Sequence, residues 1–232
     1  MKLESYKAGK YVRIEDYSAF IISGINYNWE WEDTALNKLS AEASRMIGEL
    51  NSYSKLIPNV DTYIKMLMKI EANKSNKIEG ANTSLEEDLL DESNIEPEKK
   101  ADWENAKRYL DATKYAIENV KEGSGVSKKL LKDIHKMLMQ VDDSEAKYVG
   151  KFRMSQNFVG GDTPESAEYI PPPYTEISDC MADFERFIEN QRTDTPDVVK
   201  SAMLHYQFET IHPFIGGNRK NWKNDYSTLF PK

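Results

Sequence analysis

Apolar side chains recur every three or four positions along most of this chain, which is the period of an amphipathic helix. Each stripe holds enough large apolar residues to cover one helix face. We expect the stripes to pack against one another and form the core of a mainly helical protein. They lie at 36–50, 63–70, 106–120, 130–141, 177–188 and 199–206.

Residues typical of helix ends support these ranges. Pro97 precedes the third stripe, and Gly123-Ser124-Gly125 follows it. Before the last stripe, Thr195 is expected to be the N-cap, with Pro196 in the first turn. Asp197 then favours the positive end of the helix dipole.

One region has a different pattern. Residues 151–159 and 167–170 are predicted to be two short strands around a turn at 160–164. The three prolines at 171–173 end the second strand, because proline cannot donate a hydrogen bond to a strand ladder. The pattern therefore predicts a mainly α fold with one β-hairpin.

Composition narrows the class of protein. The chain has 31 Lys and Arg against 39 Asp and Glu, a formal net charge of −8, so a general affinity for nucleic acid is not expected. Cys180 is the single cysteine, which excludes an intramolecular disulfide and fits a reducing cytosol. The apolar stretch Phe20–Ile25 is too short to span a bilayer, and the first residues lack a signal-peptide pattern. We expect a soluble, cytoplasmic protein without membrane contacts.

The candidate chemistry lies in a loop near residue 212. His212 precedes Pro213, and Gly217 and Asn218 follow soon after. A neutral imidazole can serve as a general base, and a glycine allows backbone N–H groups to approach an anion closely. Alternatively, His212 caps a helix that Pro213 ends, and a bare His-Pro-Phe sequence favours this second interpretation. His205, within the same stripe, is interpreted as structural.

Three stretches in a fixed order favour the first interpretation. The loop at 211–218 and the residues before it resemble the signature of Fic-domain proteins. Residues 150–153 and 167–173 resemble the hairpin called the flap in that family. Residues 71–80 resemble its inhibitory Ser-x-x-x-Glu-Gly motif. The resemblance extends over roughly residues 35–218.

The resemblance implies a Fic-like helical bundle with one β-hairpin flap. It also implies an N-terminal helical region at 1–95, which carries the inhibitory motif, and a catalytic core at 96–232 that is incomplete at its C-terminus. The implied activity is transfer of AMP from ATP to a Ser, Thr or Tyr hydroxyl of a protein. His212 would be the base, and Phe214, Gly217 and Asn218 would bind the nucleotide.

The family also assigns roles to the flap and to the inhibitory motif. The family's flap would hold an extended segment of a protein substrate, through Phe158, Val159, Gly160 and Gly161. The candidate substrates include this chain itself. Ser75, Glu79 and Gly80 would form the inhibitory motif, in which Glu79 pairs with a loop arginine. The alternatives are an ordinary surface hairpin and a solvated carboxylate at a helix end.

Two departures from the family pattern change the expected activity. Gly216 stands where the family has an acidic residue that holds Mg²⁺, so the metal loses its protein ligand. After Asn218, the expected Gly-Arg-x-x-Arg is replaced by Arg-Lys-Asn-Trp-Lys at 219–223. The phosphates then lose their donors, and Glu79 loses its partner. We therefore expect impaired activity.

A shifted reading frame is one explanation of the residues after Asn218. A permitted back-translation of 218–230, with one A removed at the start of the Arg219 codon, reads Asn-Gly-Arg-Ile-Gly-Arg-Met-Ile-Ile-Pro-Leu-Phe. This would restore Gly-Arg-x-x-Arg, and it implies a longer ancestral protein. The alternative is a genuinely divergent tail.

Two other functions remain open. The chain is also consistent with a non-catalytic Fic-like module that binds nucleotide or peptide. A third alternative is transfer of another phosphate-containing group.

Overall fold

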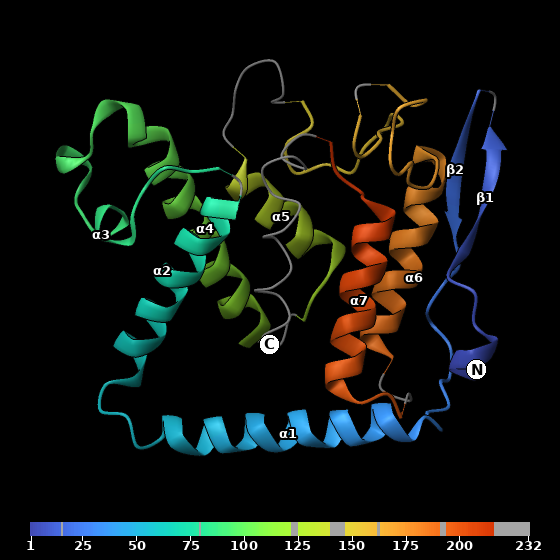
Figure 1. Cartoon of the computed structure of the whole chain (residues 1–232), viewed down its shortest axis with the longest axis horizontal. Coiled ribbons are helices and arrows are strands. Elements are labelled where there is room, and N and C mark those ends of the chain that lie inside the picture. Colours follow the sequence, from blue (N-terminus) through green and yellow to red (C-terminus); the bar gives the residue numbers. More distant parts are fainter. Residues whose placement is uncertain are drawn as a thin grey trace. The chain divides into compact units, whose positions relative to one another are not determined.

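The computed structural model describes residues 1–14, 16–78, 80–121, 125–139, 147–161, 163–190 and 194–215 (Figure 1). Most of them are helical. The α-helices are α1 (Thr34–Ser54), α2 (Val60–Ile78), α3 (Leu85–Asp88), α4 (Lys100–Lys121), α5 (Lys128–Leu138), α6 (Ile177–Glu189) and α7 (Asp197–Ile211). Short 3-10 helices are η1 (Leu3–Ser5), η2 (Glu92–Asn94), η3 (Pro97–Lys99) and η4 (Tyr174–Glu176), and the strands are β1 (Gly9–Ile14) and β2 (Tyr17–Ile22).

The chain forms two compact units. The first comprises Met1–Ile47 and Phe152–Ile215, and the second contains Gly48–Lys151. The first unit therefore contains both strands, α6 and α7, and the second contains α2 to α5. The predicted division near residue 95 stays a prediction.

The two-stranded sheet of the first unit lies at its N-terminal end. Strands β1 and β2 are antiparallel, with Gly9 opposite Ile22 and Ile14 opposite Tyr17. The backbone N–H of Phe20 also donates to the carbonyl of Ile170, 2.9 Å away. The sequence pattern did not predict this hairpin.

The predicted strands at 151–159 and 167–170 are wrong as strands. In the part of the chain that the structure describes, they share one antiparallel bridge, between Val159 and Tyr169. Phe152 forms its own bridge with Phe214, so the two segments diverge away from the turn. The flap region is thus a loop whose two segments share a single bridge.

Helices α6 and α7 lie side by side and supply the core of the first unit (Figure 1). Phe184 and Phe187 of α6 are almost completely buried, and Phe184 meets Phe208 of α7 edge to face at 5.8 Å between ring centroids. The stripe predicted at 177–188 is therefore confirmed as core. It positions α7, whose end carries His212.

The predicted N-cap of α7 is wrong. Pro196 occupies the N-cap position and forms no side-chain cap. Thr195 precedes it and is buried, where its hydroxyl accepts a hydrogen bond from the indole N–H of Trp31 at 3.1 Å. A tertiary partner has thus replaced the local capping bond.

Asp183 of α6 caps a distant loop. One of its carboxylate oxygens accepts hydrogen bonds from the backbone N–H groups of Ile25 (2.6 Å) and Asn26 (3.4 Å).

We expect Asp183→Ala to lower the free energy of unfolding by about 1–3 kcal/mol, because two part-buried donors lose a charged acceptor. Urea denaturation measures the change. Glu189→Ala, at an exposed position of the same helix, is the control and should stay within about 0.5 kcal/mol of wild type. Equal losses would contradict the capping role.

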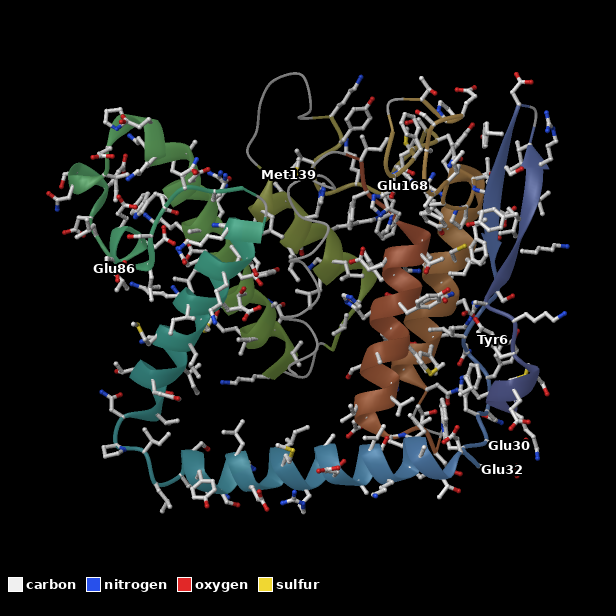
Figure 2. All side chains as sticks on the ribbon, in the orientation of Figure 1. Tyr6, Glu30, Glu32, Glu86, Met139 and Glu168 are labelled. Atoms are coloured by element: carbon white, nitrogen blue, oxygen red, sulfur yellow. The ribbon has the colours of Figure 1, made fainter. Side chains whose placement is uncertain are left out.

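Surface ion pairs tie the first residues of the chain to a segment nearby. Glu30 and Glu32, labelled in Figure 2, accept from the N-terminal amine (3.4 Å) and from Nζ of Lys2 (2.6 Å). The groups are largely solvent-exposed, so each pair contributes little to stability.

In the second unit, α4 packs against both α2 and α5 (Figure 1). Its stripe at 106–120 is confirmed as core only in part, since Ala106, Tyr109 and Thr113 are buried whereas Val120 is 43% exposed. The one polar member of the stripe, Thr113, returns its hydroxyl to the carbonyl of Tyr109 at 2.8 Å. That bond removes the cost of burying it.

The stripes at 36–50 and 63–70 are not core in this structure, so that prediction is wrong for α1 and for the first turns of α2. Leu39 and Leu50 of α1 are 63% and 67% exposed, and Leu67 of α2 is 46% exposed. Periodicity decides which side chains share a face, but it does not supply a neighbour for that face. Val141, the last member of the 130–141 stripe, lies outside the described residues.

Candidate active site

His212 is the residue at which α7 ends. Its backbone is left-handed, with φ 50° and ψ 62°, and its N–H donates to the carbonyl of Phe208 at 2.9 Å. This conformation is uncommon for a residue other than glycine, although histidine is among the residues enriched there. Pro213 follows and cannot continue the helix. The interpretation of His212 as a helix cap is confirmed, and it is compatible with a role as base.

The imidazole of His212 is buried and neutral. The residue is 6% exposed, and this burial lowers its pKa to about 4, with the charge of Arg153 acting in the same direction. A hydrogen bond with the backbone of Glu209 opposes the shift. At neutral pH the ring therefore carries no charge and has a nitrogen able to accept a proton.

Arg153 lies against the end of α7, a role that the sequence did not reveal. Its guanidinium is buried, and burial lowers its pKa to about 10. Its Nε donates to the carbonyl of His212 at 3.0 Å, and its Nη2 donates to the carbonyl of Pro172. The only sequence signal was its place in the Gly-Lys-Phe-Arg stretch of the flap motif.

Phe214 packs into the first unit as a core residue. It is buried, and its ring lies 5.3 Å from that of Phe152 and 6.2 Å from that of Phe208, between centroids. Its carbonyl accepts a hydrogen bond from the side-chain amide of Asn157 at 3.2 Å. Its nucleotide-binding role stays a prediction. Gly216, Gly217 and Asn218 lie outside the described residues.

The flap residues run through the Val159–Tyr169 bridge into a bend at Gly160 and Gly161. Phe158 and Val159 are half-buried, while Gly160 and Gly161 are exposed and have φ of 69° and 72°. A Cβ at Gly160 would lie 2.8 Å from the side chain of Glu168, which is labelled in Figure 2. Glycine is therefore required for both conformation and space. The target-docking role of this segment stays a prediction.

The inhibitory motif lies at the end of α2, in the second unit. Ser75 is buried, and Gly80 takes a positive φ of 89° just beyond the helix. Glu79 lies outside the described residues. The helix end is anchored by Asn73, whose amide donates to the carbonyl of Thr83 (3.1 Å) and to the carboxylate of Asp88 (2.7 Å).

The Mg²⁺ that the family resemblance implies stays a prediction, because residues 216–218 lie outside the described residues. Within the described ranges, no group of three or more His, Cys, Asp or Glu side chains could hold a metal ion. The sequence supplies glycine at 216, where the resemblance calls for a carboxylate ligand.

Comparison with known families accounts for most of this chain. Residues 37–118 match the Fic/DOC family N-terminal model, and residues 125–220 match the Fic/DOC family model. The chain belongs to the Fic/DOC family. Among the described residues, no helix is long and apolar enough to cross a membrane.

Curated relatives share part of this sequence. The protein adenylyltransferase Fic of Drosophila erecta is 31% identical over 120 residues, which is 51% of this chain and 22% of that protein. The corresponding protein of Drosophila melanogaster is 29% identical over the same length. The chain thus matches less than a quarter of the length of these relatives.

Solved structures show the same fold. A Fic family protein from Desulfovibrio desulfuricans G20 aligns with a TM-score of 0.57 and 22% identity, over 86% of this chain and 58% of that one. A Fic domain containing signaling protein from Bacteroides thetaiotaomicron VPI-5482 aligns with a TM-score of 0.56 and 17% identity, over 73% and 63%. The predicted mainly helical, Fic-like fold class is confirmed, although its two-stranded hairpin lies at 9–22 rather than in the flap.

Proposed function

We propose that this chain carries a protein adenylyltransferase site of the Fic type, with His212 as its general base. The observation that carries the proposal is the buried, neutral imidazole at the end of α7. Relatives named protein adenylyltransferase Fic support the choice of reaction. ATP would be the nucleotide substrate, and a protein hydroxyl would be the acceptor.

In the proposed reaction, His212 takes the proton from a Ser, Thr or Tyr hydroxyl of the target. The freed oxygen attacks the α-phosphorus of ATP, a new P–O bond forms, and the bond to the pyrophosphate breaks. The proton stays on the imidazole and is later lost to water. An anionic phosphate beside the ring would raise the pKa of His212 from about 4 toward the working pH.

The segment at 158–161 is proposed as the place where the target segment docks. Gly160 and Gly161 are exposed and carry no side chains of their own. An extended peptide could therefore approach this backbone closely and add as a strand. The target is a protein or another copy of this chain.

Ser75, Glu79 and Gly80 are proposed as an inhibitory element, in which Glu79 competes for the γ-phosphate region. The buried Ser75 and the anchored helix end support a rigid element. Glu79 requires an arginine partner, and residues 219–223 do not present one at the family's positions.

Impaired activity is part of the proposal. Gly216 removes a carboxylate that would hold Mg²⁺, and after Asn218 the family's glycine and two arginines are replaced by Arg219, Lys220 and Lys223, so the bidentate phosphate contacts of arginine are lost. These same departures favour a second candidate function, a non-catalytic module that binds nucleotide or peptide.

Incubation with α-labelled ATP and Mg²⁺ separates the two candidates. Under the first, label moves onto protein, and His212→Ala abolishes the transfer, because no other group replaces the base. His205→Ala, at an exposed position of the same helix, is the matched control and should transfer label as wild type does. Nucleotide binding without any transfer would support the module and reject the enzyme.

A further inference from the structure

Arg153 is a buried cation whose partners surround the end of α7. It is 3% exposed. In the described residues, the hydrogen bonds of its guanidinium go to backbone carbonyls: Nε to His212 (3.0 Å), Nη1 to Ser155 (3.3 Å), Nη2 to Ile211 (3.4 Å) and Nη2 to Pro172. None of these partners is a carboxylate.

A buried guanidinium without a carboxylate is costly unless other acceptors replace water. Here the end of α7 supplies them. The last carbonyls of a helix lack partners within the helix and carry the negative end of its dipole. The planar fork of Arg153 reaches several carbonyls at once, which a lysine ammonium cannot do with the same geometry.

Arg153 and the nearby Asn157 also donate hydrogen bonds to the residues that follow α7. Four successive carbonyls, from residue 211 to 214, each accept a hydrogen bond from Arg153 or Asn157. In chain order the donors are Arg153 Nη2 (3.4 Å), Arg153 Nε (3.0 Å), the Arg153 backbone N–H (2.8 Å) and Asn157 Nδ2 (3.2 Å). The backbone at 211–214 is thus held at each of its four carbonyls.

We propose that Arg153 is the positioning residue of the His212 loop: together with Asn157 it holds the four carbonyls of 211–214 and so fixes the left-handed backbone from which the imidazole projects. The inference rests on the proposed role of His212 as base. Arg153 is distinct from the arginines that the family pattern would place after Asn218, because its donors are already bound to the helix end.

The charge of Arg153 has a second consequence. It adds to burial in disfavouring a proton on His212, while the backbone of Glu209 acts in the opposite direction. The thiol of Cys180 and the phenols of Tyr169 and Tyr17 act in the opposite direction to burial on the pKa of Arg153. Burial raises the pKa of both Cys180 and Tyr169, so these two groups remain uncharged at neutral pH.

Histidine NMR on the intact chain tests the proposal without nucleotide. We expect Arg153→Met to raise the pKa of His212 by about one unit, because a neighbouring charge is removed. We also expect faster hydrogen exchange of the His212 N–H, because its loop is released. Arg153→Lys should keep the low pKa, since the charge remains, yet still accelerate exchange, since the fork is lost.

Tyr169→Phe is the matched control. It removes the hydroxyl that donates to the carbonyl of Thr210 at 2.7 Å, one residue before the four held carbonyls. It therefore weakens the same helix end without removing a charge, and it should leave the pKa of His212 unchanged. The signals are assigned with His212→Asn, because the chain has 3 histidines.

An Arg153→Met chain that folds with the wild-type His212 titration and exchange would overturn the proposal. If Arg153→Met does not fold, Arg153→Lys decides: wild-type exchange at His212 in that variant overturns it as well. The pKa of His212 could also rise as much in Tyr169→Phe as in Arg153→Met. That result would show that any weakening of this helix end raises the pKa, and it would reject the proposed role of Arg153. A chain that shows the expected shifts but transfers no AMP would reject the proposed function alone.

Discussion

Restoring the family pattern in the His212 loop is expected to raise AMP transfer by this chain by at least ~10²–10³-fold, the value of one preorganised catalytic donor. The variant combines Gly216→Asp, Arg219→Gly, Lys220→Arg and Lys223→Arg. The aspartate would supply the missing carboxylate for Mg²⁺. The glycine and the arginines would supply the missing phosphate contacts. Transfer of label from α-labelled ATP to protein, under identical conditions for both chains, measures the gain.

A further substitution makes the inhibitory role of Glu79 testable in the same assay. In the restored chain, Glu79→Gly should raise transfer again, because an arginine is then present and becomes free to hold the γ-phosphate. In the unrestored chain, Glu79→Gly should change little, since the family's arginine is absent there. An equal gain in both chains would contradict the pairing.

The control for the restored chain is the same set of changes together with His212→Ala. This control should return transfer to background, because the base is lost while the phosphate contacts are kept. Transfer that survives His212→Ala would show that the restored residues act without this base. No gain at all in the restored chain would reject the view that Gly216 and residues 219–223 limit activity.

A buried helix of this fold was predictable where its apolar residues have a helical period and the next segment of the chain covers its apolar face. The stripe at 177–188 gave α6 and its buried face, because Phe184 and Phe187 meet α7, the next helix along the chain. The stripe at 36–50 predicted α1 correctly as a helix but not its exposure. Amphipathicity is a property of one segment, whereas burial needs a second surface.

The β-structure was harder to predict, because short pairings depend on distant neighbours. The segment at 151–159 has the composition of a strand, yet Phe152 pairs with Phe214 and the Arg153 N–H donates to Pro213. The true hairpin at 9–22 is held in register by its own two strands and by a bond from Phe20 to Ile170. Strand preference is strongly context-dependent, so composition alone could not choose between the two regions.

The candidate site was likewise predictable only in part. His212 was identified from its motif, and its position after a helix was foreseen from Pro213. Its left-handed backbone and its contact with Arg153 were not foreseen, because that partner lies 59 positions earlier in the chain. A buried cation that binds carbonyls has no complementary acidic residue that would reveal it in the sequence.

Lowering the pH from 6.5 to 4 is expected to remove about 3 kcal/mol of folding stability through His212 alone. The pKa of this histidine is about 4 in the folded chain, against an ordinary value of 6.5. Between these values the unfolded chain binds the proton more readily than the folded chain. The stability from the neutral imidazole is therefore complete above pH 6.5, and it declines as the pH falls toward 4.

The variant His212→Asn isolates this contribution, because asparagine does not titrate and tolerates a left-handed backbone. Urea unfolding of both chains at several pH values gives the difference in free energy of unfolding, in which the titration of all carboxylates cancels. This difference, wild type minus variant, should fall by about 3 kcal/mol between pH 6.5 and pH 4. His205→Asn, at an exposed position of the same helix, should keep the wild-type pH profile. A constant difference between wild type and His212→Asn would show that the folded imidazole is protonated as easily as an exposed one, and a neutral buried base would then be excluded.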